Sequence, residues 1–68
     1  MNIDGRGRVR FTVDSYRFDV GPNGNVSIRE RNYDSWGETE YTVSRQKRAA
    51  LLRKHSKDVT EAKQLLGV

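Results

Sequence analysis

The chain of 68 residues contains no cysteine, one proline, one tryptophan and one histidine. Without cysteine it has neither disulfide bonds nor a thiolate zinc site, two devices that commonly stabilise domains of this size. No hydrophobic run approaches the ~20 residues that a membrane-spanning helix needs, and residues 1–5 lack the apolar segment of a signal peptide. These absences predict a single cytoplasmic domain with no membrane partner.

Residues that carry catalysis in other proteins are equally scarce. The chain offers one histidine, no cysteine nucleophile, no Walker-type loop and no metal-ligand cluster. The glycine-rich stretch Gly21-Pro22-Asn23-Gly24 stands between two predicted strands, which favours a hairpin turn over a phosphate-binding loop. His55 falls on the apolar stripe of a predicted helix, which favours a packed or interface histidine. We therefore expect a protein that is not an enzyme and has no cofactor or metal.

Two neighbouring segments, Val9–Val13 and Tyr16–Val20, alternate apolar and polar residues as half-buried strands do. Folding them about Asp14-Ser15 gives a register in which every cross-strand pair is chemically matched. The apolar pairs are Val13 with Tyr16, Phe11 with Phe18 and Val9 with Val20. The polar pairs on the other face are Arg10 with Asp19 and Thr12 with Arg17.

The turn at residues 21–24 then leads into a third strand, which sets Val20 opposite Val26 and Phe18 opposite Ile28. The connection over residues 32–37 is longer and less determined by turn chemistry. For the last hairpin we predict these pairs: Ile28 with Tyr41, Val26 with Val43, Glu30 with Thr39, Arg29 with Glu40 and Arg31 with Glu38. The two charge-matched pairs would each contribute ~0.2–1 kcal/mol.

From Ser44 to Leu66 the chain lacks glycine and proline and is rich in helix-forming residues. Ser44 suits an N-cap and Gly67 a C-terminal stop, so we predict one helix over about residues 45–66. The capping-box pattern from Asp58 to Glu61 indicates a second start, which would bend or break the helix near Ser56.

The predicted fold class is therefore α+β: a small four-stranded antiparallel β-meander with one C-terminal helix packed on its apolar face. The strands are expected at about residues 8–13, 16–20, 25–31 and 38–43. Residues 1–7 form a flexible N-terminal arm, and residues 8–68 form a single domain. Helix residues Ala62, Leu65 and Leu66 could extend beyond the sheet and make a homodimer contact.

Positive charge is unevenly distributed along the chain, whose net charge is +4. Residues 45–57 carry six positive charges and no acid, and the arm adds more arginines. This asymmetry favours an anionic partner, and we predict a non-catalytic nucleic-acid-binding or regulatory module, with DNA favoured over RNA. The predicted contacts are Arg8, Arg10, Arg17, Arg29, Arg31, Lys47, Arg53, Lys54 and Lys57. The simpler alternative is that both surfaces are ordinary solvated faces of mixed charge.

The architecture is similar to sheet-based DNA-binding domains, such as those at the N-termini of some site-specific recombinases. In such domains the open face of a small sheet enters the major groove, where arginine side chains contact guanine. No motif of this chain ties it to that family.

The alternative function is that of a small phage- or mobile-element-type protein, which inhibits or adapts an acidic host protein. Its contact surface would comprise Tyr33, Trp36 and a sheet edge, because exposed aromatic residues are typical interface anchors. Trp36 could equally fold back to cap the small core. A homodimer through Leu65 and Leu66 stays open, as does the choice between Glu30 and the sheet edge as the contact of Arg48.

Overall fold

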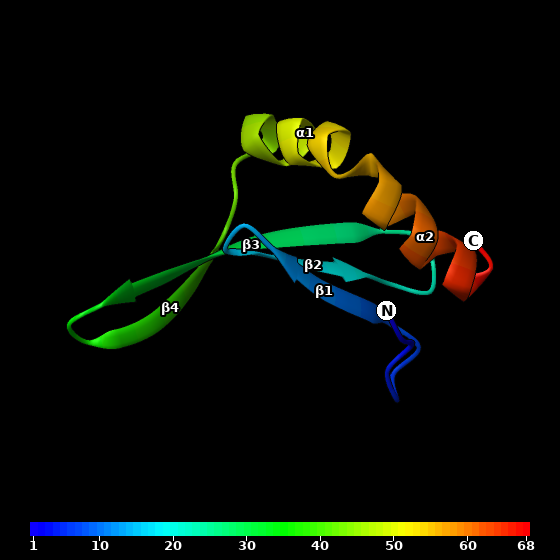
Figure 1. The fold of residues 1–68 in the computed structure, drawn as a ribbon, viewed down its shortest axis with the longest axis horizontal. Coiled ribbons are helices and arrows are strands. Elements are labelled where there is room, and N and C mark those ends of the chain that lie inside the picture. The colour runs from blue at the N-terminus through cyan, green and yellow to red at the C-terminus, as the bar shows by residue number, and fades with distance from the viewer.

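The computed structural model describes all residues from 1 to 68. It contains strands β1 (Val9–Val13), β2 (Tyr16–Val20), β3 (Val26–Asp34) and β4 (Gly37–Thr42), followed by helices α1 (Arg45–Lys54) and α2 (Ser56–Leu66). The strands form one antiparallel sheet in the order β1-β2-β3-β4. Both helices lie on the same side of this sheet (Figure 1). The predicted α+β meander is confirmed, with one open sheet face and one face covered by helices.

The first two hairpins have the predicted register. Val9 pairs with Val20 and Phe11 with Phe18 between β1 and β2, and Phe18 pairs with Ile28 between β2 and β3. The β1–β2 turn places Asp14 and Ser15 at φ values of 49° and 67°. These left-handed angles match the right-handed twist of the strands in a two-residue hairpin, a position where glycine and asparagine are usual.

The predicted register of the β3–β4 hairpin is wrong by two residues. Asp34 pairs with Gly37 across a two-residue turn, so Tyr41 lies opposite Glu30 instead of Ile28. The Asp34 carboxylate stabilises this turn by accepting a hydrogen bond from the Trp36 backbone N–H at 2.8 Å. Because side chains alternate with period two, the shift leaves every residue on its predicted face.

Both predicted charge pairs of this hairpin survive the shift as diagonal contacts. Arg31 Nε donates a hydrogen bond to Glu38, although Glu40 is its direct neighbour across the ladder. Arg29 lies 3.9 Å from Glu40, although Thr42 is its direct neighbour. Diagonal neighbours on one face are within reach of long side chains, so the two registers satisfy the same charges.

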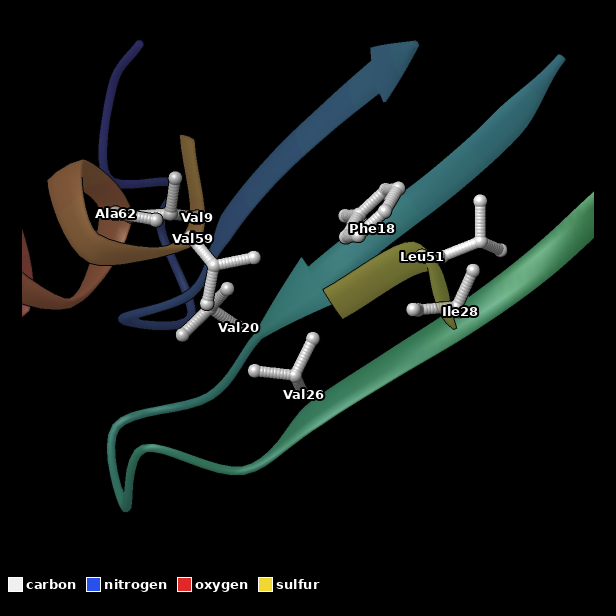
Figure 2. Close-up of a cluster of buried hydrophobic side chains, with 8 residues drawn as sticks. All are labelled: Val9, Phe18, Val20, Val26, Ile28, Leu51, Val59 and Ala62. Atoms are coloured by element: carbon white, nitrogen blue, oxygen red, sulfur yellow. The ribbon is translucent and has the colours of Figure 1, made fainter. Parts of the chain in front are cut away.

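The hydrophobic core joins the covered face of the sheet to both helices (Figure 2). Phe18 is fully buried near its centre, stacked on the Phe11 ring with centroids 4.8 Å apart. The eight buried apolar residues are Val9, Phe18, Val20, Val26, Ile28, Leu51, Val59 and Ala62. The prediction that Ala62 could extend beyond the sheet is wrong, because its side chain lies close to Val9 inside this core.

The C-terminal segment forms two helices, not one, and the chain bends between them at His55. The break lies within one residue of Ser56, as the sequence indicated, but Asp58 falls in the first turn of α2 and does not cap it. The His55 side chain is 10% exposed and meets the Phe18 ring edge-on at 5.7 Å. A straight helix of this length would span about 33 Å, and the bend instead brings α2 down onto the sheet (Figure 1).

The start of α1 is attached to β3 by two cations. Arg48 donates from Nε and Nη2 to the Val26 carbonyl oxygen at 3.2 and 2.8 Å. Lys47 Nζ donates to Glu30 at 3.2 Å, so Glu30 is the partner of Lys47 and not of Arg48. The hydroxyl of Tyr16 and the carboxylate of Glu30 raise the pKa of Lys47. These contacts hold α1 over the covered face.

The β1–β2 turn offers a test of the backbone geometry. Replacing Ser15 by Gly should stabilise the fold by about 0.5–1 kcal/mol, because glycine adopts positive φ without the steric penalty of a Cβ atom. Urea unfolding followed by circular dichroism would measure the change. The control is Ser35→Gly in the β3–β4 turn, where φ is not positive and no gain is expected. Equal effects of the two substitutions would contradict the assigned turn.

Candidate nucleic-acid interface

The open face of the sheet carries a hollow of about 570 Å³ that no apolar side chain lines. Side chains alternate between the two faces of β1, β2 and β3. The apolar ones point into the core, so the polar and charged ones line the open face. We call this site the arginine hollow; it is lined by Arg6, Arg8, Arg10, Arg17, Asp19, Ser27, Arg29 and Glu40. These lining residues, five arginines and two carboxylates, carry a net charge of +3, and a third carboxylate, Asp4, lies 3.9 Å from Arg10.

Two carboxylates each bridge a pair of arginines in the arginine hollow. Asp19 lies 3.3 Å from Arg8 and 3.2 Å from Arg10. Glu40 lies 3.1 Å from Arg17 and 3.9 Å from Arg29. The four arginine side chains nevertheless stay between 39% and 60% exposed. Their guanidinium groups are therefore oriented by protein carboxylates while retaining N–H donors that face solvent.

Arg17 and Arg29 lie directly opposite each other on β2 and β3. Like charges at such a position destabilise a sheet by some tenths of a kcal/mol, and Glu40 offsets the repulsion by contacting both. A sheet face optimised for stability alone would place opposite charges here. The structure therefore concentrates positive charge at a point where the fold does not need it.

The N-terminal segment folds back toward β1 and brings Arg6 to the arginine hollow. The Asp4 carboxylate accepts hydrogen bonds from the backbone N–H groups of Arg6 and Arg8 at 2.8 and 2.9 Å. These bonds, that of Arg8 first, lower the pKa of Asp4. Ile3 forms a β-bridge with Val9. Arg6 was not among the contacts predicted from the sequence, although the Asp4-Gly5 pair is a turn signal that indicates such a reversal of the chain.

Arg31 lies on the same open face but outside the arginine hollow. Its Nε donates to Glu38, and its Nη2 donates to the Tyr33 hydroxyl at 2.7 Å. The hydrogen bond with Glu38 is the main cause that raises the pKa of Arg31 and lowers the pKa of Glu38. The side-chain contacts of Arg31 are therefore made within the β3–β4 hairpin, and not with the residues of the arginine hollow.

The predicted helical contacts lie elsewhere. Lys47 pairs with Glu30, and Lys54 lies 3.7 Å from Asp14. Arg53 and Lys57 are exposed on helices that lie on the opposite side of the sheet from the arginine hollow (Figure 1). The nine predicted basic contacts therefore do not form one surface: four line the arginine hollow, Arg31 adjoins it, and the helical four are separate.

The predicted protein-interface residues also separate into two groups. Tyr33 and Trp36, 70% and 93% exposed, lie at the free end of the β3–β4 hairpin. The prediction that Trp36 could cap the core is wrong. Leu65 is 43% exposed on α2, while Leu66 packs against the core. The hairpin end and α2 lie at opposite ends of the molecule (Figure 1).

Comparisons of the chain with protein-family models, with curated proteins and with solved structures give no match. No helix has the length and apolar character needed to cross a membrane. No group of three or more histidine, aspartate or glutamate side chains is arranged to hold a metal ion.

The Arg31–Glu38 contact gives a pH-dependent prediction. Arg31→Met should raise the pKa of Glu38 toward its ordinary value of 4.5, measured by NMR titration. Because the pKa of Glu38 is lowered in the fold, the pair stabilises the protein above about pH 4.5 and loses this effect as the pH falls through the folded pKa. Arg53→Met, far from this hairpin, should leave the Glu38 titration unchanged. An unchanged titration in Arg31→Met would contradict the contact.

Proposed function

We propose that this protein is a non-catalytic nucleic-acid-binding module that docks through the open face of its sheet. The observation that carries the proposal is the arginine hollow, where five arginines from β1, β2, β3 and the N-terminal segment converge. DNA is favoured over RNA because the architecture is similar to sheet-based DNA-binding domains. We place its action in the cytoplasm.

The chemistry of the arginine hollow suits phosphate groups. Guanidinium groups present planar arrays of N–H donors that match phosphate oxygens in a bidentate way. Asp19 and Glu40 each contact two arginines and hold their guanidinium groups in place, which lowers the entropy lost when a ligand binds. Their negative charges also weaken attraction to any polyanion, so a ligand must satisfy several guanidinium groups at once to bind tightly.

The helical cations play at most a secondary part in this proposal. A ligand in the arginine hollow contacts the open face, whereas α1 and α2 cover the other face. Arg53 and Lys57 add to the long-range field of the protein, which is screened beyond ~8 Å at physiological salt. Their exposure is consistent with solvated helix exteriors.

The test compares two double substitutions that remove the same charge. Arg10→Gln with Arg29→Gln acts in the arginine hollow, and Arg53→Gln with Lys57→Gln acts on the helices. Fluorescence anisotropy of labelled oligonucleotides at ~50 and ~200 mM salt would give affinities and log–log salt slopes. Loss of two phosphate contacts should reduce the slope by about 1.4–1.8 for the first variant and little for the second.

Equal losses in the two variants would show that net charge, and not the arginine hollow, determines binding. Failure of the unsubstituted protein to bind any oligonucleotide at ~50 mM salt, where phosphate contacts are strongest, would overturn the proposal.

A second candidate function is recognition of a host protein by a small phage- or mobile-element-type inhibitor or adaptor. The 93% exposure of Trp36 favours it, because a large exposed aromatic ring at a projecting turn suits an interface anchor. Positive charge would steer association with an acidic partner. Capture of one discrete host protein, lost in Trp36→Ala and unaffected by the Arg10/Arg29 substitutions, would support this function.

A further inference from the structure

The β3–β4 hairpin extends beyond the part of the sheet that the helices cover (Figure 1). Along β3, alternation places Arg29, Arg31 and Tyr33 on one face, which is the face of the arginine hollow. Tyr33 is four positions after Arg29, a distance of about 13 Å along a strand. The basic face of the sheet is therefore continued by an aromatic ring.

The Tyr33 ring is exposed yet held in place. Arg31 Nη2 donates to its hydroxyl at 2.7 Å, and Arg31 Cζ lies 5.6 Å from the ring centroid. Glu38 on β4 in turn holds Arg31. An exposed ring with this support loses little conformational freedom when a flat group packs on it.

A second ring lies at the same end of the hairpin. Trp36 occupies the turn, and the Asp34 carboxylate fixes the turn through the Trp36 backbone N–H. Neither Trp36 nor Tyr33 belongs to the hydrophobic core or packs against it. Nothing in the fold therefore requires two large aromatic side chains at this position.

Charge differs between the two parts of this face. The residues that line the arginine hollow carry a net charge of +3, whereas the hairpin end carries Asp34 and Glu38 against Arg31. Phosphates are therefore attracted to the hollow and not to the hairpin end. A ligand that covers both must be polyanionic at one place and offer flat, uncharged groups about 13 Å away.

We propose that the hairpin end is a base-stacking platform and that the ligand is single-stranded nucleic acid. The proposal rests on the proposed function and specifies its ligand class. The sugar–phosphate backbone of the nucleic acid would lie in the arginine hollow, and its unpaired bases would stack on Tyr33 and Trp36. The ~13 Å along β3 corresponds to about four nucleotides at the 3.4 Å spacing of stacked bases. Bases inside a duplex have no free face to offer these rings.

The experiment uses three labelled probes of equal length: an oligothymidylate, its abasic counterpart with the same phosphates, and a duplex. Base stacking contributes about 1–3 kcal/mol per base, so the abasic strand should bind about 5- to 150-fold more weakly for each base that stacks. Trp36 is the only tryptophan of the chain. Its fluorescence should be quenched by the oligothymidylate and not by the abasic strand.

Tyr33→Leu should reduce the preference for the oligothymidylate over the abasic strand by about 5- to 150-fold, the contribution of one stacked base, and leave the part due to Trp36. The matched control is Tyr41→Leu, because Tyr41 is a half-exposed tyrosine on the opposite face of the same hairpin. Circular dichroism would confirm that both variants fold. The control should retain the preference and the quenching.

The other outcomes separate the two proposals. Equal affinity for the thymidine and abasic strands, without quenching, would overturn the stacking platform and leave the arginine hollow as a phosphate site. Tighter binding of the duplex would overturn the single-strand assignment alone. No binding of any probe at ~50 mM salt would overturn both proposals.

Discussion

Burial of Phe18 is the interaction on which the rest of the structure depends. Its ring packs between neighbours on both adjacent strands, Phe11 and Ile28, and meets His55 at the bend between the helices. A slip of one residue would turn Phe18 outward and bring Arg17 and Asp19 into the core, where unpaired charge is very unfavourable. This one ring therefore selects the register of two hairpins and decides which face remains open.

An open face with no role in the core is free to carry charge that the fold does not need. The arginine hollow uses this freedom at a modest energetic cost, since Asp19 and Glu40 each offset repulsion between two neighbouring arginines. The same carboxylates contact the guanidinium groups, whose side chains stay partly exposed. The contacts that offset the repulsion are thus the ones that would pre-organise the arginines for the anionic ligand proposed above.

Sequence reasoning recovered the features that alternation controls and missed those that depend on geometry. The faces and the first two registers followed from period-two patterning around well-marked turns. The last register did not, because Arg31 reaches Glu38 either directly or diagonally, and Ser35-Trp36 is not a typical turn pair. The bend near Ser56 was indicated by the polar pattern from Asp58 to Glu61, but its place at His55 was not, because no glycine or proline marks it. The basic residues lie on two sides of the sheet. This placement depends on the tertiary fold and cannot be predicted from composition.

The charged hollow and the aromatic hairpin end of the open face also differ in how the fold supports them. The hollow lies on strands that the core holds, whereas the hairpin end has no helix over it. Polar contacts on each of its faces replace the missing core: Arg31 with Glu38 and Tyr33 on one, and Asn32 with the Tyr41 hydroxyl at 2.9 Å on the other. Because these contacts do not involve the core, a ligand at the hairpin end can be bound without displacing Phe18. If the proposed function is right, phosphates would bind to the part of the sheet that the core holds, and bases would stack on the part that these polar contacts hold.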